Sequence, residues 1–232
     1  MGGQGGSVKG YGQYCPIALA AEVFAERWTP VILRNMTLGC TRFGEILDGA
    51  PGLPRSVLSA RLRNLQRDGV VRREQDGRAT SYHLTDSGRE LAAICTSLGV
   101  WGTRWREAPP EHRDPALMLW GLARLVPPDS LPRPRVVARF DITDKRAPNR
   151  FWLIASFSGN EVCVHPPGFD EHAVVTTDTN TLMRWQGGQH SLAQAQKSGA
   201  MTVTGVRWAI RELARWGTLS PFAGIQPVHV GR

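Results

Sequence analysis

The chain has 232 residues, with 28 Lys and Arg against 20 Asp and Glu, a formal net charge of +8 and a sequence pI near 10.0. It has no run of 18 apolar residues and no apolar segment of signal-peptide type at its start, which predicts a cytoplasmic protein without a membrane partner. Four cysteines without a C-x-x-C pair argue against a disulfide framework or a zinc cluster, and we expect no metal and no other cofactor.

The first half of the chain predicts helices followed by a hairpin. Residues 1–12 contain six glycines and predict a disordered tail. Apolar residues at helical spacing predict helices over 16–27, 31–38, a short segment after Thr41, and 55–68. Thr29 before Pro30 is typical of an N-cap, and Thr41 is expected to cap the short helix. Asp76-Gly77 between β-like runs at 70–74 and 80–84 predicts a hairpin, and a further helix begins at Thr85. This order predicts a mainly α winged helix-turn-helix domain over 13–108.

The second half predicts a separate α+β domain over 111–226, after a boundary at Ala108-Pro109-Pro110. The expected strands cover 135–144, 150–157, 160–165, 173–177 and 200–205. The expected helices cover 117–125, 180–186, 191–197 and 206–216. No phosphate loop, G-x-S-x-G, H-E-x-x-H or G-x-G-x-x-G motif is present, so we expect no enzyme.

Arginine supplies most of the positive charge, with 25 Arg against 3 Lys. Codon usage in a GC-rich genome explains that ratio as well as nucleic-acid binding does. Position is more informative, because six arginines between Arg55 and Arg73 face one acid, Asp68. Arginine suits phosphates and guanine edges, so we expect double-stranded DNA as the partner. The candidate DNA-binding residues are Arg42, Arg55, Ser56, Ser59, Arg61, Arg63, Arg72, Arg73 and Arg78. Of these, Arg61 is also a candidate for packing its stem.

Residues 14–106 resemble the HxlR family of bacterial winged-helix regulators. The resemblance is carried by Cys15-Pro16, Arg27-Trp28-Thr29, Ile32-Leu33-Arg34, Arg42-Phe43-x-Glu45-Ile46, Val57-Leu58-Ser59-x-Arg61-Leu62-x-x-Leu65 and Tyr82-x-Leu84-Thr85-x-x-Gly88. It implies a DNA-binding homodimer formed by the last helix and the first. One departure is Pro54-Arg55-Ser56, where the family has Ser-Pro-Lys, so the side-chain N-cap of the recognition helix is lost.

The helix after Thr85 is too apolar to be an exposed terminal helix. It either packs against the second domain or pairs with a twin subunit. The candidate dimer residues are Leu91, Ile94, Leu98, Trp101 and Trp105.

Cys15 is a redox candidate because it directly precedes Pro16 at a helix start, a position that favours the thiolate. Some regulators that the family resembles sense oxidants or electrophiles at this position. An inert, packed thiol is the other interpretation.

Residues 113–225 resemble the sterol carrier protein 2 domain, a small α+β lipid-binding fold. Val174-Val175-Thr176-Thr177-Asp178 before Leu182 and Trp185, then 199–205 and the closing helix, carry this resemblance. It implies an apolar tunnel and an apolar small-molecule effector, whereas a filled core is the alternative. The candidate ligand-binding residues are Trp152, Ile154, Phe157, Leu182, Trp185, Trp208 and Trp216.

Together these features predict a bacterial DNA-binding transcriptional regulator whose second domain senses an apolar molecule. One alternative is a carrier of hydrophobic ligands that uses the first domain for dimerisation. Another is a thiol-based redox regulator acting through Cys15.

Overall fold

The computed structural model describes residues 10–228, so most of the predicted tail lies outside the described residues. The chain forms two compact units that divide between Ser97 and Leu98, within one continuous helix. Each unit is described by itself. Within the described part, no helix has both the length and the apolar character needed to cross a membrane.

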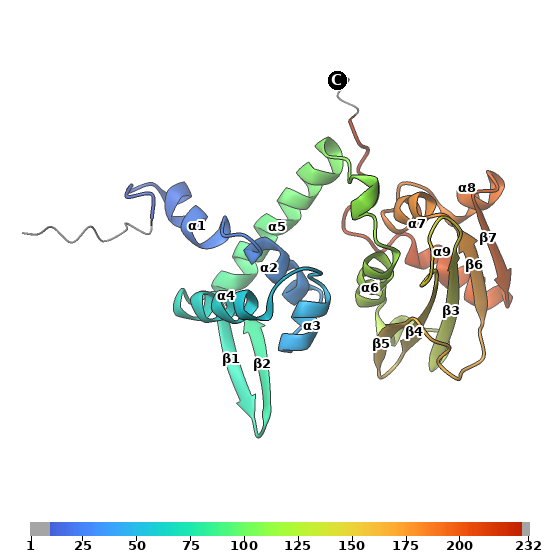
Figure 1. Cartoon of the computed structure of the whole chain (residues 1–232), viewed down its shortest axis with the longest axis horizontal. Helices are drawn as coiled ribbons and strands as arrows, with labels where there is room; N and C mark the ends of the chain where they lie inside the picture. Colours follow the sequence, from blue (N-terminus) through green and yellow to red (C-terminus); the bar gives the residue numbers. More distant parts are fainter. Residues whose placement is uncertain (1–9, 229–232) are drawn as a thin grey trace, which may run out of the picture. The chain divides into compact units, whose positions relative to one another are not determined.

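The N-terminal unit has the predicted order of helices and hairpin (Figure 1). Its elements are α1 (Pro16–Phe24), α2 (Thr29–Thr37), α3 (Phe43–Asp48), α4 (Arg55–Arg67), β1 (Val71–Asp76), β2 (Ala79–Leu84) and α5 (Asp86–Trp105). β1 and β2 pair antiparallel, and their hairpin projects from the helices as a wing. The unit is held together by side chains from α2, α3 and α4, of which Ile32, Leu33, Ile46, Leu58 and Leu62 are fully or almost fully buried.

Two predicted caps are wrong. Trp28, with φ 78°, precedes α2, while Thr29 is the first helical residue and is buried. Arg42 precedes α3, and Glu45 Oε2 accepts hydrogen bonds from the backbone N–H groups of Thr41 (2.9 Å) and Arg42 (3.1 Å). At α3 the hydrogen bonds to Glu45 replace the Thr cap that the sequence pattern favours, whereas α2 begins without a side-chain cap.

A buried amide fixes α2 against α3. Asn35 is fully buried, and its Nδ2 donates to the carbonyl of Ile46 at 2.8 Å. Its Oδ1 accepts from Arg34 Nε at 3.0 Å and Nη2 at 2.7 Å, and Arg34 Nη2 also donates to the carbonyl of Gly49. Both the oxygen and the nitrogen of this buried amide therefore have hydrogen-bond partners. A buried polar group is tolerated under that condition.

The wing is attached to the helices at its base. Thr85 Oγ1 donates to the carbonyl of Gly69 at 2.6 Å and accepts from the backbone N–H of Gly88 at 3.1 Å. A Cβ on Gly88 would lie 2.1 Å from the carbonyl oxygen of Val70. Only glycine lets α5 approach this close to the start of β1, which explains the Thr85-x-x-Gly88 motif in physical terms.

The C-terminal unit is a mixed five-stranded sheet with order β5-β4-β3-β6-β7. The strands are β3 (Arg135–Ile142), β4 (Arg150–Ser156), β5 (Gly159–Cys163), β6 (Ala173–Thr177) and β7 (Met201–Gly205). The helices are α6 (Pro115–Leu125), α7 (Thr179–Gln186), α8 (Leu192–Lys197) and α9 (Arg207–Trp216), with 3-10 turns at Pro110–His112 and Pro128–Ser130. β3 is parallel to β6, whereas the other three pairings are antiparallel. The predicted elements of this half are confirmed to within two residues at each end.

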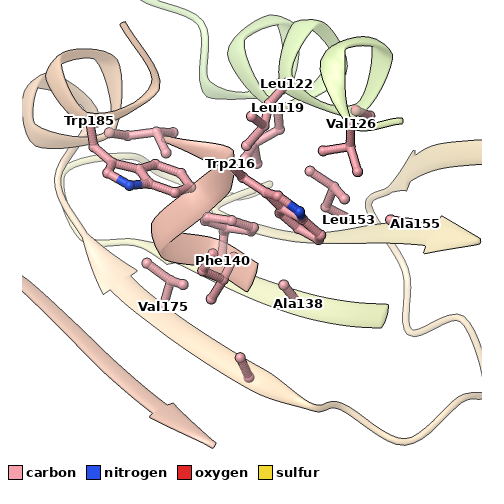
Figure 2. Close-up of a cluster of buried hydrophobic side chains, with 14 of the residues drawn as sticks. Leu119, Leu122, Val126, Ala138, Phe140, Leu153, Ala155, Val175, Trp185 and Trp216 are labelled. Carbon is pink, nitrogen blue, oxygen red and sulfur yellow. The ribbon is translucent and has the colours of Figure 1, made fainter. Parts of the chain in front are cut away.

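All four helices contribute to one core on one face of this sheet. Alternate strand residues point into it, including Ala138 and Phe140 of β3 and Leu153 of β4, as the two-residue period of a strand requires. Figure 2 shows Trp185 and Trp216 lying between the helices and the sheet, near Phe140. The rings of Phe140 and Trp185 have centroids 6.1 Å apart.

The opposite face of the sheet carries a smaller cluster of Val137, Trp152 and Ile154. Polar groups surround it, because Trp152 Nε1 donates to Glu171 Oε1 at 2.8 Å and Arg139 Nη1 pairs with Glu171 Oε2 at 2.7 Å. The sheet therefore separates two apolar regions of very different size.

Candidate nucleic-acid interface

Helix α4 has one buried face and one polar face. Leu58, Leu62 and Leu65 are at most 2% exposed, as the predicted stripe requires. Pro54 precedes the helix without a side-chain cap, as expected from the sequence. Among the described residues no side chain caps the first backbone N–H groups of this helix, and such an exposed helix start is where a phosphate is favoured.

The polar face of α4 presents arginine and serine. Arg55, Ser56 and Arg63 are exposed, and Ser59 is half-buried. The Arg55 guanidinium carbon lies 5.1 Å from the centroid of the Phe43 ring, which orients this side chain from α3. Arg63 Nη1 donates to Ser59 Oγ at 2.8 Å, one turn earlier on the same face.

Arg61 is directed elsewhere. Its Nη2 pairs with Glu26 Oε2 at 2.5 Å, and its Nε donates to the carbonyl of Arg27 at 3.2 Å. Its side chain is 20% exposed and joins α4 to the segment before α2. The signal for this position was already in the spacing, since residue 61 lies three after Leu58 and four before Leu65, on the flank of the buried stripe.

The two faces of the wing differ in charge. Arg72 and Glu74 share one face, where they pair at 2.9 Å, and His83 Nε2 lies 3.4 Å from the same carboxylate. Arg73 lies opposite Tyr82 on the other face, and its Nη2 contacts Thr80 Oγ1 at 3.5 Å. On the first face the arginine is therefore paired with an acid of the same face, whereas on the second face Arg73 is exposed.

The tip of the wing and the start of α3 add two further cations. Arg78 is exposed next to Gly77, whose φ of 55° the tight turn requires. Arg42 is exposed at the start of α3, and the neighbouring Thr41 carbonyl accepts from the backbone N–H of Tyr82 at 2.7 Å. That bond ties the wing to α3. Within residues 10–228, no ion pair with an acid is present at Arg42, Arg55, Arg63, Arg73 or Arg78.

The comparisons with known proteins agree with this architecture. A family model described as HxlR-like helix-turn-helix matches residues 23–110. The uncharacterized HTH-type transcriptional regulator Mb3122 of Mycobacterium bovis is 37% identical over 117 residues, covering 44% of this chain and 73% of that protein. The chain belongs to the HxlR-like helix-turn-helix family. It is therefore a bacterial helix-turn-helix transcriptional regulator.

Other relatives of this HxlR-like protein cover a similar share of the chain. The uncharacterized HTH-type transcriptional regulator YvaP of Bacillus subtilis is 35% identical over 97 residues, covering 40% of this chain and 90% of that protein. Among solved structures, the redox regulator HypR in its oxidized form has 31% identity and a TM-score of 0.36, covering 38% of this chain and 94% of that one. The matched family model ends at residue 110, so the C-terminal sheet lies beyond it.

Helix α5 of the HxlR-like protein exposes an apolar stripe. Trp101 is 56% exposed, and Ile94, Leu98 and Trp105 are between 43% and 46% exposed. Leu91, earlier on the stripe, is half-buried. On α1, Ile17 and Leu19 are also exposed, at 80% and 50%.

All four cysteines lie in the described residues and are free thiols. Cys15 is half-exposed at the residue before α1. Burial raises the pKa of Cys95, whose Sγ donates to the carbonyl of Pro30 at 3.6 Å. Burial and the nearby Glu161 raise the pKa of Cys163. Cys40 is fully buried. Cys15 differs from these three cysteines because it directly precedes the first residue of a helix.

The candidate ligand residues of the C-terminal unit do not meet in one place. Leu182, Trp185 and Trp216 lie in the main core, while Trp152 and Ile154 lie on the other face of the sheet. Of the two that remain, Trp208 packs against the main core, whereas Phe157 belongs to neither cluster. Phe157 is 57% exposed, and Trp208 packs its ring 4.9 Å from that of His172.

Sequence reasoning missed a cavity of about 200 Å³ beside Trp185. It is bounded by the α7–α8 connection, the end of α9 and the segment after it. Its lining includes Gly188, Gln189, His190, Gly217 and Ala223. These are mostly small or polar residues with no apolar periodicity, so no pattern in the sequence pointed to them.

Proposed function

We propose that this HxlR-like protein reads operator DNA as a homodimer through α4 and the wing. The observation that carries the proposal is a set of five exposed arginines, before α3, on α4 and on the wing, that form no ion pair with an acid among the described residues. A helix placed in the major groove needs its N-terminal polar face free, and α4 has that face free. Phosphates neutralised by the wing would add affinity without sequence preference.

Within α4, Arg55 and Arg63 are proposed to read base edges. Both are exposed; Arg63 points away from the buried leucines, and Arg55 lies in the first turn of the helix, beside Phe43. A guanidinium can contact guanine O6 and N7 together, which contributes about 1–3 kcal/mol against the wrong base. Arg61 is proposed to support α4 through Glu26 rather than to touch DNA.

The dimer is proposed to form through α5, with α1 alongside it. The exposed apolar stripe of α5 and the exposed Ile17 and Leu19 of α1 support this arrangement, since exposed apolar surface marks association sites. Two recognition helices related by a twofold axis would meet half-sites about 34 Å apart.

The C-terminal unit is proposed to resemble the sterol carrier protein 2 domain and to sense a small, largely apolar molecule. A mixed sheet with four helices packed on one face supports this proposal. Because the main core is filled by Trp185, Trp216 and Phe140, the ligand is expected beside this core rather than through its centre.

The test is fluorescence anisotropy of the full chain on its own upstream DNA and on a scrambled duplex, across salt concentrations. We expect selective binding with a steep salt dependence. Arg63→Gln should reduce discrimination between the two duplexes by about tenfold, whereas Arg207→Gln, an exposed arginine at the start of α9, should leave it unchanged. Equal binding of both duplexes by the unmodified protein would refute operator reading.

Two other functions make different predictions for variants of the same residues. For a carrier of hydrophobic ligands, charge reversal at Arg55 and Arg63 would leave ligand binding and cellular activity intact. For a thiol-based regulator, diamide would change DNA affinity and Cys15→Ser would abolish that change. Cys15 is favoured for that role by its half-exposed position before Pro16 at the start of α1.

A further inference from the structure

The last part of the sequence contains almost no acidic residues. From residue 179 to the end, six Lys and Arg stand against one acid, Glu212, whereas the first 178 residues hold the other 22 basic and 19 acidic residues. Codon usage can favour arginine over lysine, but it does not remove acids from one segment. This part of the C-terminal unit therefore differs in charge from the rest of the chain.

Helix α9 places three of these cations on one face. Arg207, Arg211 and Arg215 are exposed and follow one another at intervals of four residues, so they lie on one side of the helix and form the α9 stripe. At 1.5 Å per residue, the stripe extends over about 12 Å of the helix axis. Glu212 is buried, and both of its carboxylate oxygens accept from Arg215 Nη1, at 2.9 and 3.0 Å. The one acid is thus already paired, and among residues 10–228 Arg207 and Arg211 form no ion pair.

The neighbours of α9 do not compensate this charge. The elements in closest contact with α9 are β7 and α8, and neither contains an acid. The loop before β6 reaches α9 at His172, whose ring lies 4.9 Å from that of Trp208, but Glu171 of this loop is paired with Arg139 at 2.7 Å. In the described part of the chain, no ion pair joins an acid of this loop to α9. The stripe therefore presents uncompensated positive charge to solvent, which attracts an anionic partner.

The apolar side of α9 decides between two anionic partners, a membrane surface and a nucleic acid. Leu213 and Trp216 are buried, and Trp208 and Ile210 pack against the main core; Figure 2 shows Trp216 within that core. A helix that lies on a membrane inserts an apolar face into the lipid, and the large apolar residues of α9 are already used by the core. A phosphate backbone requires only charge and hydrogen-bond donors, which a guanidinium supplies as a planar fork.

Membership of a helix-turn-helix regulator family also favours DNA over other polyanions. A duplex bound by the N-terminal unit is held near the C-terminal unit, because the two units belong to one chain. Such tethering raises the effective concentration of the duplex, so even a weak second contact adds to the affinity.

We propose that the α9 stripe binds the phosphate backbone of the duplex DNA that the chain holds. Arg207 and Arg211 supply the free charges, while Arg215 remains paired with Glu212. Because a phosphate carries no base identity, the contact adds affinity without sequence preference. Its loss weakens operator and scrambled duplex alike and leaves the discrimination between them unchanged, which is also the behaviour expected of Arg207→Gln alone.

The experiment is fluorescence anisotropy of the full chain on its own upstream DNA and on a scrambled duplex at several salt concentrations. The test variant combines Arg207→Gln with Arg211→Gln. The matched control combines Arg133→Gln with Arg146→Gln, which removes two exposed arginines of the same unit that lie outside α9 and form no ion pair in the described residues. A third variant, Arg207→Lys with Arg211→Lys, keeps the charge. All four residues are exposed, so unfolding in urea should be the same for all variants.

The test variant should lower the slope of log affinity against log salt by about 1.8 for each C-terminal unit in contact with DNA, on both duplexes. That decrease corresponds to about a 12-fold smaller loss of affinity between 50 and 200 mM salt. The control and the lysine variant should keep the slope of the unmodified protein. An unchanged slope in the test variant would overturn the proposal, and so would an equal decrease in the control, since net charge alone would then account for it.

Co-sedimentation with vesicles of phosphatidylcholine and phosphatidylglycerol tests the membrane as the partner. Vesicle binding that the test variant loses, together with an unchanged slope on DNA, would assign the stripe to a lipid surface and overturn the proposal. Operator reading by α4 is judged separately, from the discrimination of the unmodified protein between the two duplexes. Failure of one proposal is therefore distinguished from failure of the other.

Discussion

Exchange of Arg72 and Arg73 for glutamine, one at a time, tests which face of the wing meets DNA. The two residues are neighbours on β1 and lie on opposite faces, since Arg72 is opposite His83 and Arg73 is opposite Tyr82. Each exchange removes the same charge from the same strand. The structure nevertheless predicts different results, because Arg72 pairs with Glu74 at 2.9 Å and Arg73 has no acidic partner in the described residues.

The magnitude follows from counterion release. A phosphate contact contributes about 0.9 to the slope of log affinity against log salt, so loss of Arg73 from both subunits of a dimer should reduce that slope by about 1.8. Between 50 and 200 mM salt, this corresponds to about a 12-fold smaller loss of affinity. Arg72 must leave Glu74 to reach a phosphate, and the freed carboxylate takes up a cation. Its net release of counterions, and hence the change in slope, should be close to zero.

The assay is anisotropy of the full chain on one duplex at several salt concentrations, with unfolding in urea as a check that both variants keep the stability of the wing. Equal changes in slope for Arg72→Gln and Arg73→Gln would show that charge alone, not the ion pair with Glu74, decides the contribution. A larger change for Arg72→Gln would place the opposite face of the wing on DNA. Either result would refute the reasoning from partnered and unpartnered arginines.

Two further predictions concern stability, each measured by urea unfolding. Asn35→Ala should lower the free energy of unfolding of the N-terminal unit by about 3 kcal/mol, because the carbonyl of Ile46 and the Arg34 guanidinium lose a buried partner. Burial raises the pKa of Asp178, but hydrogen bonds from Thr181 lower it further, so the net pKa lies below its ordinary value. That stabilisation is present above the ordinary carboxyl pKa and is lost as pH falls through the lower folded value, so Asp178→Asn should reduce the loss of stability between pH 7 and pH 3.

The architecture of both halves could be predicted because it depends on periodic apolar residues. The leucines of α4 repeat with the helical period, and the buried residues follow it. The strands β3 and β4 are short apolar runs, and β4 is buried on both faces after its first residue. The caps at Thr29 and Thr41 could not be predicted the same way. At the first, Trp28 adopts a positive φ, and at the second, Glu45 supplies the acceptor from within α3.

The sequence could predict which arginines belong to the candidate DNA interface. It could not predict which of them form ion pairs with acids of the same chain. The sequence groups Arg61, Arg63 and Arg72 as cations in or near the recognition helix, with stem packing as a further possibility for Arg61. The structure separates them, since Glu26 holds Arg61 and Glu74 holds Arg72, while Arg63 contacts only a serine among the described residues. Glu26 is 35 positions away from Arg61, and no local pattern predicts that such distant residues will pair.

The segment after α9 shows why the cavity beside Trp185 was not predictable. Gly217 and Ala223 line the cavity beside Trp185, and between them Phe222 packs onto α5, where a Cβ on Gly99 would lie 2.3 Å from its ring. On Gly188, across the cavity, a Cβ would lie 2.4 Å from that of Ala223. Glycine in a sequence is typical of a turn or a helix end. At Gly99, Gly188 and Gly217, however, a neighbouring group lies so close that a side chain would clash with it. A cavity bounded by positions of close approach has no sequence pattern, and only the three-dimensional arrangement reveals that the wall of the cavity and the contact on α5 belong to the same few residues.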